Sequence, residues 1–469
     1  MIESQGPANS RRPRRRWLTW TFTLVGCCAL LLRWGWVHYK WHLDELEFRE
    51  AVEEADLLDP GWGLADLEAA RAVVPDADNS AFQVQAAHRL MPKDWLPHPP
   101  DGGDCLESVI GDLPPQARLN QKQLNELACE LAKVSDAVLA ARRLAEMPRG
   151  RYRLVWTNGA MFTPLPHLED VREVSRLLKV DAVRQIQNGN IDEALTSCMA
   201  ILNAGRSIGD EPGSQWERVY CQQLTVENME RALSQGQACD TALLSIQRLL
   251  QDESEQPLLL IVARGNRAIS HEFLSVLEAG QLDRASLSWH RSRRSPELEE
   301  MLDKKRAHAS HGACLKYQTE CVEIRKLPLE EQLDHPQRRT CPRAEECTAI
   351  LEGACASNTD PVVVYGYRVA LLRCGLTALA AERYRLVHNR WPDKLEDLVP
   401  TILDKILADP FDGQPLRYKL LNDGLVIYSV GVDRKDDSGR LERRKPIFEP
   451  GTDVGFQLWN PERRSQPPR

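Results

Sequence analysis

The segment HASHGAC holds the densest group of side chains in this sequence that could perform chemistry. His308, His311 and Cys314 recur at steps of three residues, so a helix would carry all three on one face. Histidine and cysteine are the usual ligands of structural zinc. The segment also fits an exposed polar turn, which we favour because the surrounding residues are charged and interrupted by prolines.

The cysteines around this segment suggest disulfide bonds in an oxidising compartment rather than a metal centre. No C-x2-C pair occurs among them, which argues against zinc. Five cysteines fall within residues 314–355, namely Cys314, Cys321, Cys341, Cys347 and Cys355.

The familiar catalytic motifs are missing from the sequence. It contains no G-x-S-x-G, no P-loop, no G-x-G-x-x-G and no H-E-x-x-H; the pair His271–Glu272 lacks the second histidine. No catalytic residue and no required cofactor are therefore predicted. An extracytoplasmic hydrolase with an unrecognised active site in the helical part stays open as the alternative, because many active sites leave no local motif.

The N-terminus predicts a membrane anchor. Residues 1–16 contain five arginines and one glutamate and are expected to stay in the cytoplasm. Residues 17–37 are largely apolar and, as a helix, would span about 31 Å, close to the thickness of a bilayer core. Aromatic residues at both ends fit the two membrane interfaces: Trp17, Trp20, Trp34, Trp36, Tyr39 and Trp41.

This pattern predicts an inner-membrane (cytoplasmic-membrane) protein with its N-terminus inside and its bulk outside. A lipoprotein is the alternative, since LVGC resembles a lipobox and would make Cys27 the lipidated residue. The formal net charge is −8 despite the basic N-terminus, which argues against nucleic acid as a partner.

Most of the remaining chain reads as helix. Residues 42–285 are predicted to form a helical ectodomain, with turns at Gly189, Gly236 and Gly280 where one helical run ends and the next begins. The turns fit a helical repeat or a plain bundle, and we favour the bundle. Residues 286–360 predict an irregular cysteine-containing linker or insertion, and residues 462–469 a disordered tail.

The C-terminal region changes character. A long helix from residue 361 ends before Pro392, and turn-rich residues follow. LRYKLL and GLVIYSVG are joined by Asn422-Asp423-Gly424, which predicts a β-hairpin, and VGFQLW can add a third strand. The predicted fold class is thus mainly α, with an N-terminal transmembrane helix, a helical-bundle or repeat-like ectodomain and a small C-terminal α+β domain.

Three ordered motifs in this region resemble a known family. AERYRLVHNRWPDKLEDLVP, DPFDGQPLRY and YSVGVDRKDDSG are similar to the C-terminal half of type II secretion major pseudopilins and related type IV pilin-like proteins. The resemblance implies a pilin-like domain over residues 361–461, a long helix on a short antiparallel sheet. Gly26 stands where the pilin start has glutamate, so a filament subunit is not expected.

The resemblance also implies a calcium site. The last loop of the family often holds calcium, and Asp433 and Asp453 fall where that family places ligands, with Asp436 and Asp437 between them. Four carboxylates could supply much of the six to eight oxygens that calcium takes. A solvated acidic loop is the alternative.

These features together predict a membrane-anchored structural or interaction protein of the bacterial envelope, similar to uncharacterised single-span membrane proteins. Its expected partners are the membrane, spanned once, and other envelope proteins, including those of secretion assemblies.

Overall fold

The computed structural model describes residues 14–93, 95–96, 110–111, 113–213, 215–282, 304–335, 361–442 and 450–467. The predicted basic segment before residue 14, together with Cys341, Cys347 and Cys355, lies outside these ranges. The predicted fold class is confirmed in its coarse form, because the described chain is mainly helical with one three-stranded antiparallel sheet near its C-terminus.

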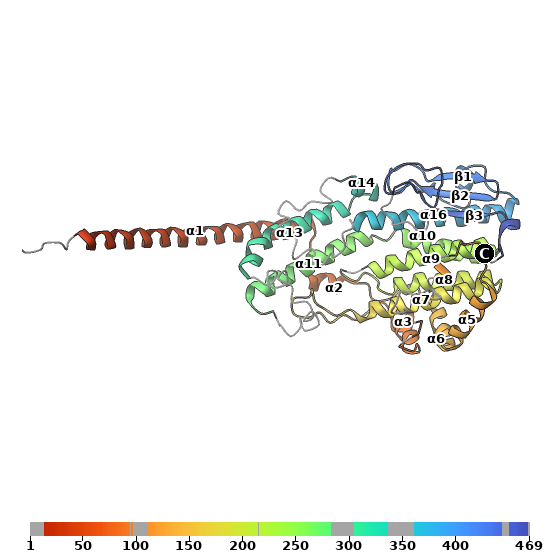
Figure 1. Ribbon diagram of the computed structural model, residues 1–469, viewed down its shortest axis with the longest axis horizontal. Coiled ribbons are helices and arrows are strands. Elements are labelled where there is room, and N and C mark those ends of the chain that lie inside the picture. Colours follow the sequence, from red (N-terminus) through yellow and green to blue (C-terminus); the bar gives the residue numbers. More distant parts are fainter. Residues whose placement is uncertain are drawn as a thin grey trace, which may run out of the picture.

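The first described element is a single rod that projects from the body (Figure 1). Helix α1 (Arg14–Leu58) combines the predicted anchor and the next predicted helix without a break. Its N-terminal half is exposed, with Trp20 and Leu32 each 75% accessible, whereas Ala51 and Ala55 are fully buried against the body. One helix is therefore both a candidate membrane span and part of the folded body.

The next elements form the lower flank of the body in Figure 1. They are short because prolines and polar caps interrupt them. Residues 121–142 form two helices that are divided at Lys133 and Val134, and a capping box at Asn120 starts the first. The elements are α2 (Leu64–Ala70), α3 (Ser80–Arg89), α5 (Gln121–Ala132) and α6 (Ser135–Arg142).

Longer helices build the centre of the body. Gly189 and Gly280 adopt the positive φ expected of glycines that end a helix, and Gly236 also lies at a helix end, so the predicted turns are confirmed. The helices pack as a bundle, with α8 in contact with α7, α9 and α10. They are α7 (Pro166–Gln187), α8 (Ile191–Arg206), α9 (Trp216–Gln235), α10 (Asp240–Ser254) and α11 (Leu258–Ala279).

The region predicted to be an irregular linker contains two helices. Helices α13 (Lys304–Arg325) and α14 (Leu329–Asp334) lie within residues 286–360. Helix α13 packs along both α1 and α11. The prediction was wrong for these residues because their apolar periodicity is weak: polar side chains, including histidines, occupy the buried face.

The C-terminal hairpin matches its prediction closely. Strands β1 (Arg417–Leu421) and β2 (Gly424–Ser429) pair antiparallel around the two-residue turn, and β3 (Val454–Trp459) pairs with β2. The sheet order is β1-β2-β3, so β1 is an edge strand. In Figure 1 this sheet lies at the end of the body away from the α1 rod.

The sheet is not a separate domain, although the sequence predicted a boundary at residue 361. Helix α16 (Pro361–His388) packs against both the sheet and helices α9 and α10. One apolar core runs from Leu195 and Met229 in the bundle, through Leu379 in α16, to Phe456 in β3. We therefore expect the fragment 361–461 to expose apolar surface when it is isolated.

The predicted disordered tail is also wrong for the residues described. Arg464 is buried and donates hydrogen bonds to both carboxylate oxygens of Glu382, at 3.0 and 2.9 Å. The backbone N–H of Ser465 donates to the carbonyl of Ser234. A buried ion pair this close to the end of a chain leaves no periodic pattern in the sequence.

Two described helices are long and apolar enough to cross a membrane, α1 and α16. They differ in whether their apolar surface is buried or exposed. The most apolar window of α16 is 78% buried inside the body, which marks it as a core helix, whereas none of the α1 window is buried. Among the described helices, α1 is thus the candidate anchor.

The close approach of β2 and β3 at Gly424 gives a testable prediction. A Cβ atom there would lie 1.9 Å from the carbonyl oxygen of Leu458, which is backbone and cannot rotate away. We expect Gly424→Ala to lower the free energy of unfolding by at least about 2 kcal/mol, measured by chemical denaturation.

Gly413→Ala is the matched control. Gly413 has a φ of +70° but open space around it, so the same substitution there should cost only about 1 kcal/mol of backbone strain. Equal losses at the two positions would contradict the steric explanation.

Candidate functional site

The histidines noted in the sequence lie on a helix and are buried, so the predicted exposed turn is wrong. His308 and His311 on α13 are 7% and 2% exposed, and Cys314 is packed in an apolar cluster with Phe273. They do share one face of α13, as their spacing predicted for a helix. That face is turned inward, toward α11 and α1.

His308 and His311 meet two residues of α11 that the sequence did not link to them. The histidine cluster comprises His271, Glu278, His308 and His311. His271 Nδ1 lies 3.0 Å from His311 Nε2, and His311 Nδ1 lies 2.7 Å from Glu278 Oε1. His308 Nδ1 is 3.6 Å from the other oxygen of Glu278. His271 and Glu278 are two helical turns apart, a spacing that could have indicated a shared face.

Aromatic side chains from the α1 end of the chain cover this cluster. The ring of Trp41 stacks on His308 with 3.6 Å between centroids, and Phe48 lies 4.3 Å from His311. Trp62, which follows α1, meets His271 edge-on. The helices come this close because position 312 is glycine: a Cβ there would lie 2.7 Å from the backbone nitrogen of Phe48.

The environment changes the acid–base behaviour of two members of the cluster. Burial, reinforced by the positive charge of His311, lowers the pKa of His271 to about 4. Burial alone would raise the pKa of Glu278, but the hydrogen bonds and charges of His311 and His308 outweigh it and hold this pKa below its usual range. At neutral pH His271 is therefore uncharged and Glu278 is ionised.

The four predicted calcium ligands lie in one loop, the aspartate loop, which connects β2 to β3. Their oxygens already accept local hydrogen bonds. Asp453 accepts from the backbone of Asp437 and Gly439, at 3.2 and 2.7 Å, and Asp433 accepts from Gly451. Asp436 accepts from the hydroxyl of Tyr428. These contacts explain the acidic residues as acceptors that close the loop.

In part of this loop, however, negatively charged carboxylates still lie close to one another. Burial raises the pKa of Asp453, and the neighbouring charges of Asp436 and Asp437 add to that effect against the backbone donors. Asp437 Oδ2 is buried and has no hydrogen-bond partner. Even so, no three His, Cys, Asp or Glu side chains converge as a metal site anywhere in the part of the chain that is described.

A cavity of about 240 Å³ lies beside the aspartate loop. Asp433 and Asp453 line it together with Lys179 of α7, Arg231 of α9 and Tyr367 of α16. It therefore sits where the bundle, the long core helix and the sheet meet. Both charge signs and an aromatic ring are available in it, but no nucleophile–base pair is among its lining residues.

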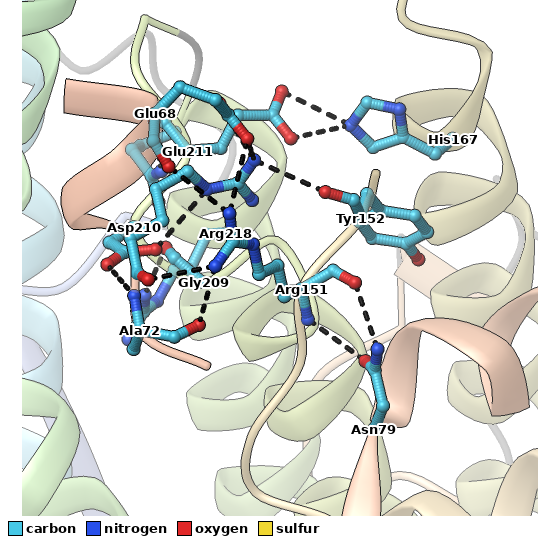
Figure 2. Close-up of polar contacts among 12 residues, drawn as sticks. Glu68, Ala72, Asn79, Arg151, Tyr152, His167, Gly209, Asp210, Glu211 and Arg218 are labelled. Atoms are coloured by element: carbon cyan, nitrogen blue, oxygen red, sulfur yellow. Dashed lines mark hydrogen bonds and ion pairs between the residues drawn. The ribbon is translucent and has the colours of Figure 1, made fainter. Parts of the chain in front are cut away.

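A third polar group, drawn in Figure 2, holds the middle of the body together. His167 Nε2 faces both carboxylate oxygens of Glu211, at 3.2 and 2.9 Å, and the Tyr152 ring stacks on His167. Asn79 bonds both backbone groups of Arg151, as two dashed lines in Figure 2 show. These contacts connect the extended residues 151–157 to their neighbours.

Arg218 joins this group to a buried ion pair. Its guanidinium donates to the carbonyl of Gly209 and, through two nitrogens, to Glu253 at 2.8 and 2.7 Å. Gln222 also donates to Glu253, which is 2% exposed. The role of this group is structural, since Arg206, Arg218 and Gln222 all donate to Glu253 and satisfy its charge.

No family model, no curated protein and no solved structure matches this chain. The resemblance to pseudopilins therefore rests on the three C-terminal motifs and stays a prediction.

The Arg218–Glu253 pair generates a stability prediction. Glu253→Gln keeps the shape of the side chain but leaves the buried guanidinium of Arg218 without its counter-charge. We expect a loss of about 3–5 kcal/mol in the free energy of unfolding, measured by denaturant titration.

Glu169→Gln provides the control, because Glu169 pairs with Arg172 on the surface and is 57% exposed. That substitution should cost less than about 1 kcal/mol. Similar losses for the two variants would show that the buried pair is no more important than a surface pair.

Proposed function

We propose that this chain is a single-span envelope protein whose extracytoplasmic body binds other proteins. One observation carries the proposal: α1 is a single helix that is exposed and apolar at one end and built into the body at the other. A helix that continues from a membrane into a folded body fixes the distance and orientation of that body. Such a connection suits a protein that presents a surface to partners.

The surface we propose for partner contact is the sheet. It lies at the end of the body away from the α1 rod (Figure 1). Its edge strand β1 carries Leu420 with half of its side-chain area exposed. An edge strand offers unpaired backbone groups to another chain. The resemblance of this region to pseudopilins supports a partner in an envelope or secretion assembly.

The alternative function, an extracytoplasmic hydrolase, receives less support from the structure. His167, His311 and His88 each face a carboxylate, as a catalytic base would. Within the described residues, the hydrogen bonds of His167 and His311 lead to carboxylates or to another histidine, and not to a serine, threonine or cysteine. Without a nucleophile beside the base, the described residues favour binding over hydrolysis.

Photo-crosslinking in cells tests the proposal. A photo-reactive amino acid at Leu420 should yield a discrete adduct with an envelope protein, whereas the same group at Leu139 should not. Leu139 is a matched control, because it is an equally large side chain, 64% exposed, on helix α6. Absence of an adduct from Leu420, or equal adducts from both positions, would overturn the proposal.

The orientation is checked in the same cells. Protease added to spheroplasts should remove a C-terminal epitope, because the body is proposed to lie outside the cytoplasm. Retention of the epitope would contradict that orientation. Incorporation of palmitate that is lost in Cys27→Ala would instead assign the anchor to a lipid on Cys27.

Calcium is a secondary proposal for the aspartate loop. It is supported by the unpartnered Asp437 Oδ2 and by the burial and crowding of charge that raise the pKa of Asp453. We expect a site of the weak extracellular kind, with a Kd on the order of 1 mM. At 10 mM calcium the native state would then gain about 1.4 kcal/mol, a rise in Tm on the order of 2 °C.

The measurement is thermal unfolding of the full chain in detergent, in 10 mM calcium and in chelator. The rise should disappear in Asp437→Asn, which keeps the size of the side chain and removes its charge. Identical melting curves for the unmodified chain in the two conditions would show that the aspartates serve only to close the loop.

A further inference from the structure

The contact between α1 and α13 contains ionisable groups where a joint between helices is usually apolar. Ala51 and Ala55 of α1 pack on Leu315 of α13, as expected of such a joint. About one and three helical turns before Ala51, however, Phe48 and Trp41 lie directly on His311 and His308. The histidine cluster therefore forms part of the surface on which α1 is seated.

The facing ring nitrogens can share only one proton. His311 uses both ring nitrogens, Nδ1 toward Glu278 and Nε2 toward His271 Nδ1. In the hydrogen bond between the two rings, either His311 Nε2 donates to His271 Nδ1 or His271 Nδ1 donates to His311 Nε2. A second proton between these nitrogens would remove the acceptor and set two N–H groups against each other at 3.0 Å.

Other charges near His271 do not relieve that repulsion. On α11, Arg267 lies one turn before His271 and stacks over Trp62, with Asp59 at the end of α1 as its ion-pair partner. Arg264 shares the same carboxylate. On α13, the charge of Glu323 acts on Arg267. On α1, Trp41 presents a backbone carbonyl to His308, and the stem of Glu47 lies beside Gly312.

The carboxylate of Glu278 contacts the histidines, and His311 and His308 already share its charge. We expect a second positive charge on the facing rings to be relieved by movement of the rings apart. His271 belongs to α11, while Phe48 and Trp62 cover it from the α1 side. Separation of the rings would push against these aromatic side chains.

We propose that the joint between α1 and the body is sensitive to protons, and that protonation of His271 releases α1 from α13. The inference concerns the joint itself and does not depend on which partner the body binds. In the orientation proposed above, the cluster would lie outside the cytoplasm, just beyond the anchor, where it would experience the external pH. Acid would then uncouple the body from the rigid rod.

The direction of the effect follows from the pKa of His271. It is about 4 in the seated state and would return toward its ordinary value of 6.5 once His271 is exposed to water. The state in which α1 is released from α13 then binds the proton more tightly. The contact of α1 with α13 is therefore strongest above pH 6.5 and weakens as the pH falls from 6.5 to 4. Over that whole pH range, the equilibrium between packed and released α1 should shift toward release by on the order of 300-fold.

Hydrogen exchange of the full chain in detergent, measured by mass spectrometry, tests the proposal. After correction for intrinsic rates, protection of residues 44–58 should fall between pH 7.5 and pH 4.5, by up to on the order of 80-fold. Protection of α16, in the core of the body, should stay constant and serves as the internal reference. Constant protection of residues 44–58 over this range would overturn the proposal.

Two variants at His271 separate titration from packing. In His271→Gln the amide oxygen can still accept from His311, and in His271→Phe an aromatic ring still fills the site, but neither side chain can take a proton. Either variant, provided that it retains its helix content at pH 7.5, should lose most of the pH dependence. The exposed His388 on α16 supplies the control, since His388→Gln should behave as the unmodified chain. Unchanged pH dependence in a folded His271 variant would overturn the proposal.

Discussion

The burial of α16 is the constraint on which the rest of the structure depends. This helix is apolar on nearly every side, and it can satisfy that surface only by contact with two layers at once. The sheet covers one side of it, and α9 and α10 cover another. Gly375 permits the close approach, since a Cβ there would already touch Val226 of α9. The small sheet and the helical bundle therefore share one core and are expected to fold together.

Charges buried around this core add specificity rather than simple stability. Glu382, on the same helix, is fully buried and is satisfied by both Arg385 and Arg464. Removing one member of such a group leaves an uncompensated charge, so each pair effectively fixes the position of its partner. In this way Arg464 holds the C-terminal end of the described chain against the bundle, and Glu253 with Arg218 holds the middle of the body.

The contact between α1 and the body differs from this core in the kinds of side chain it contains. There the seating surface includes histidines whose charge depends on pH, and a glycine on α13 brings the two backbones close. A core of leucine and alanine would hold α1 equally under all conditions. Under the proposal above, the histidines make the attachment of the rod depend on pH. The sheet proposed for partner contact and the joint lie at opposite ends of the body (Figure 1).

Local sequence patterns determined several elements directly. The apolar run with flanking tryptophans indicated the exposed part of α1, and Asn422-Asp423-Gly424 determined the hairpin, because both signals depend on neighbouring residues alone. The glycines at the ends of α7 and α11 belong to the same class. By contrast, the pairing of His311 with His271 and Glu278, the burial of Arg464 and the sharing of one core across residue 361 were decided by tertiary structure. Each of these joins residues far apart in the chain, and a polar side chain that is buried by a distant partner looks the same in the sequence as one exposed to water.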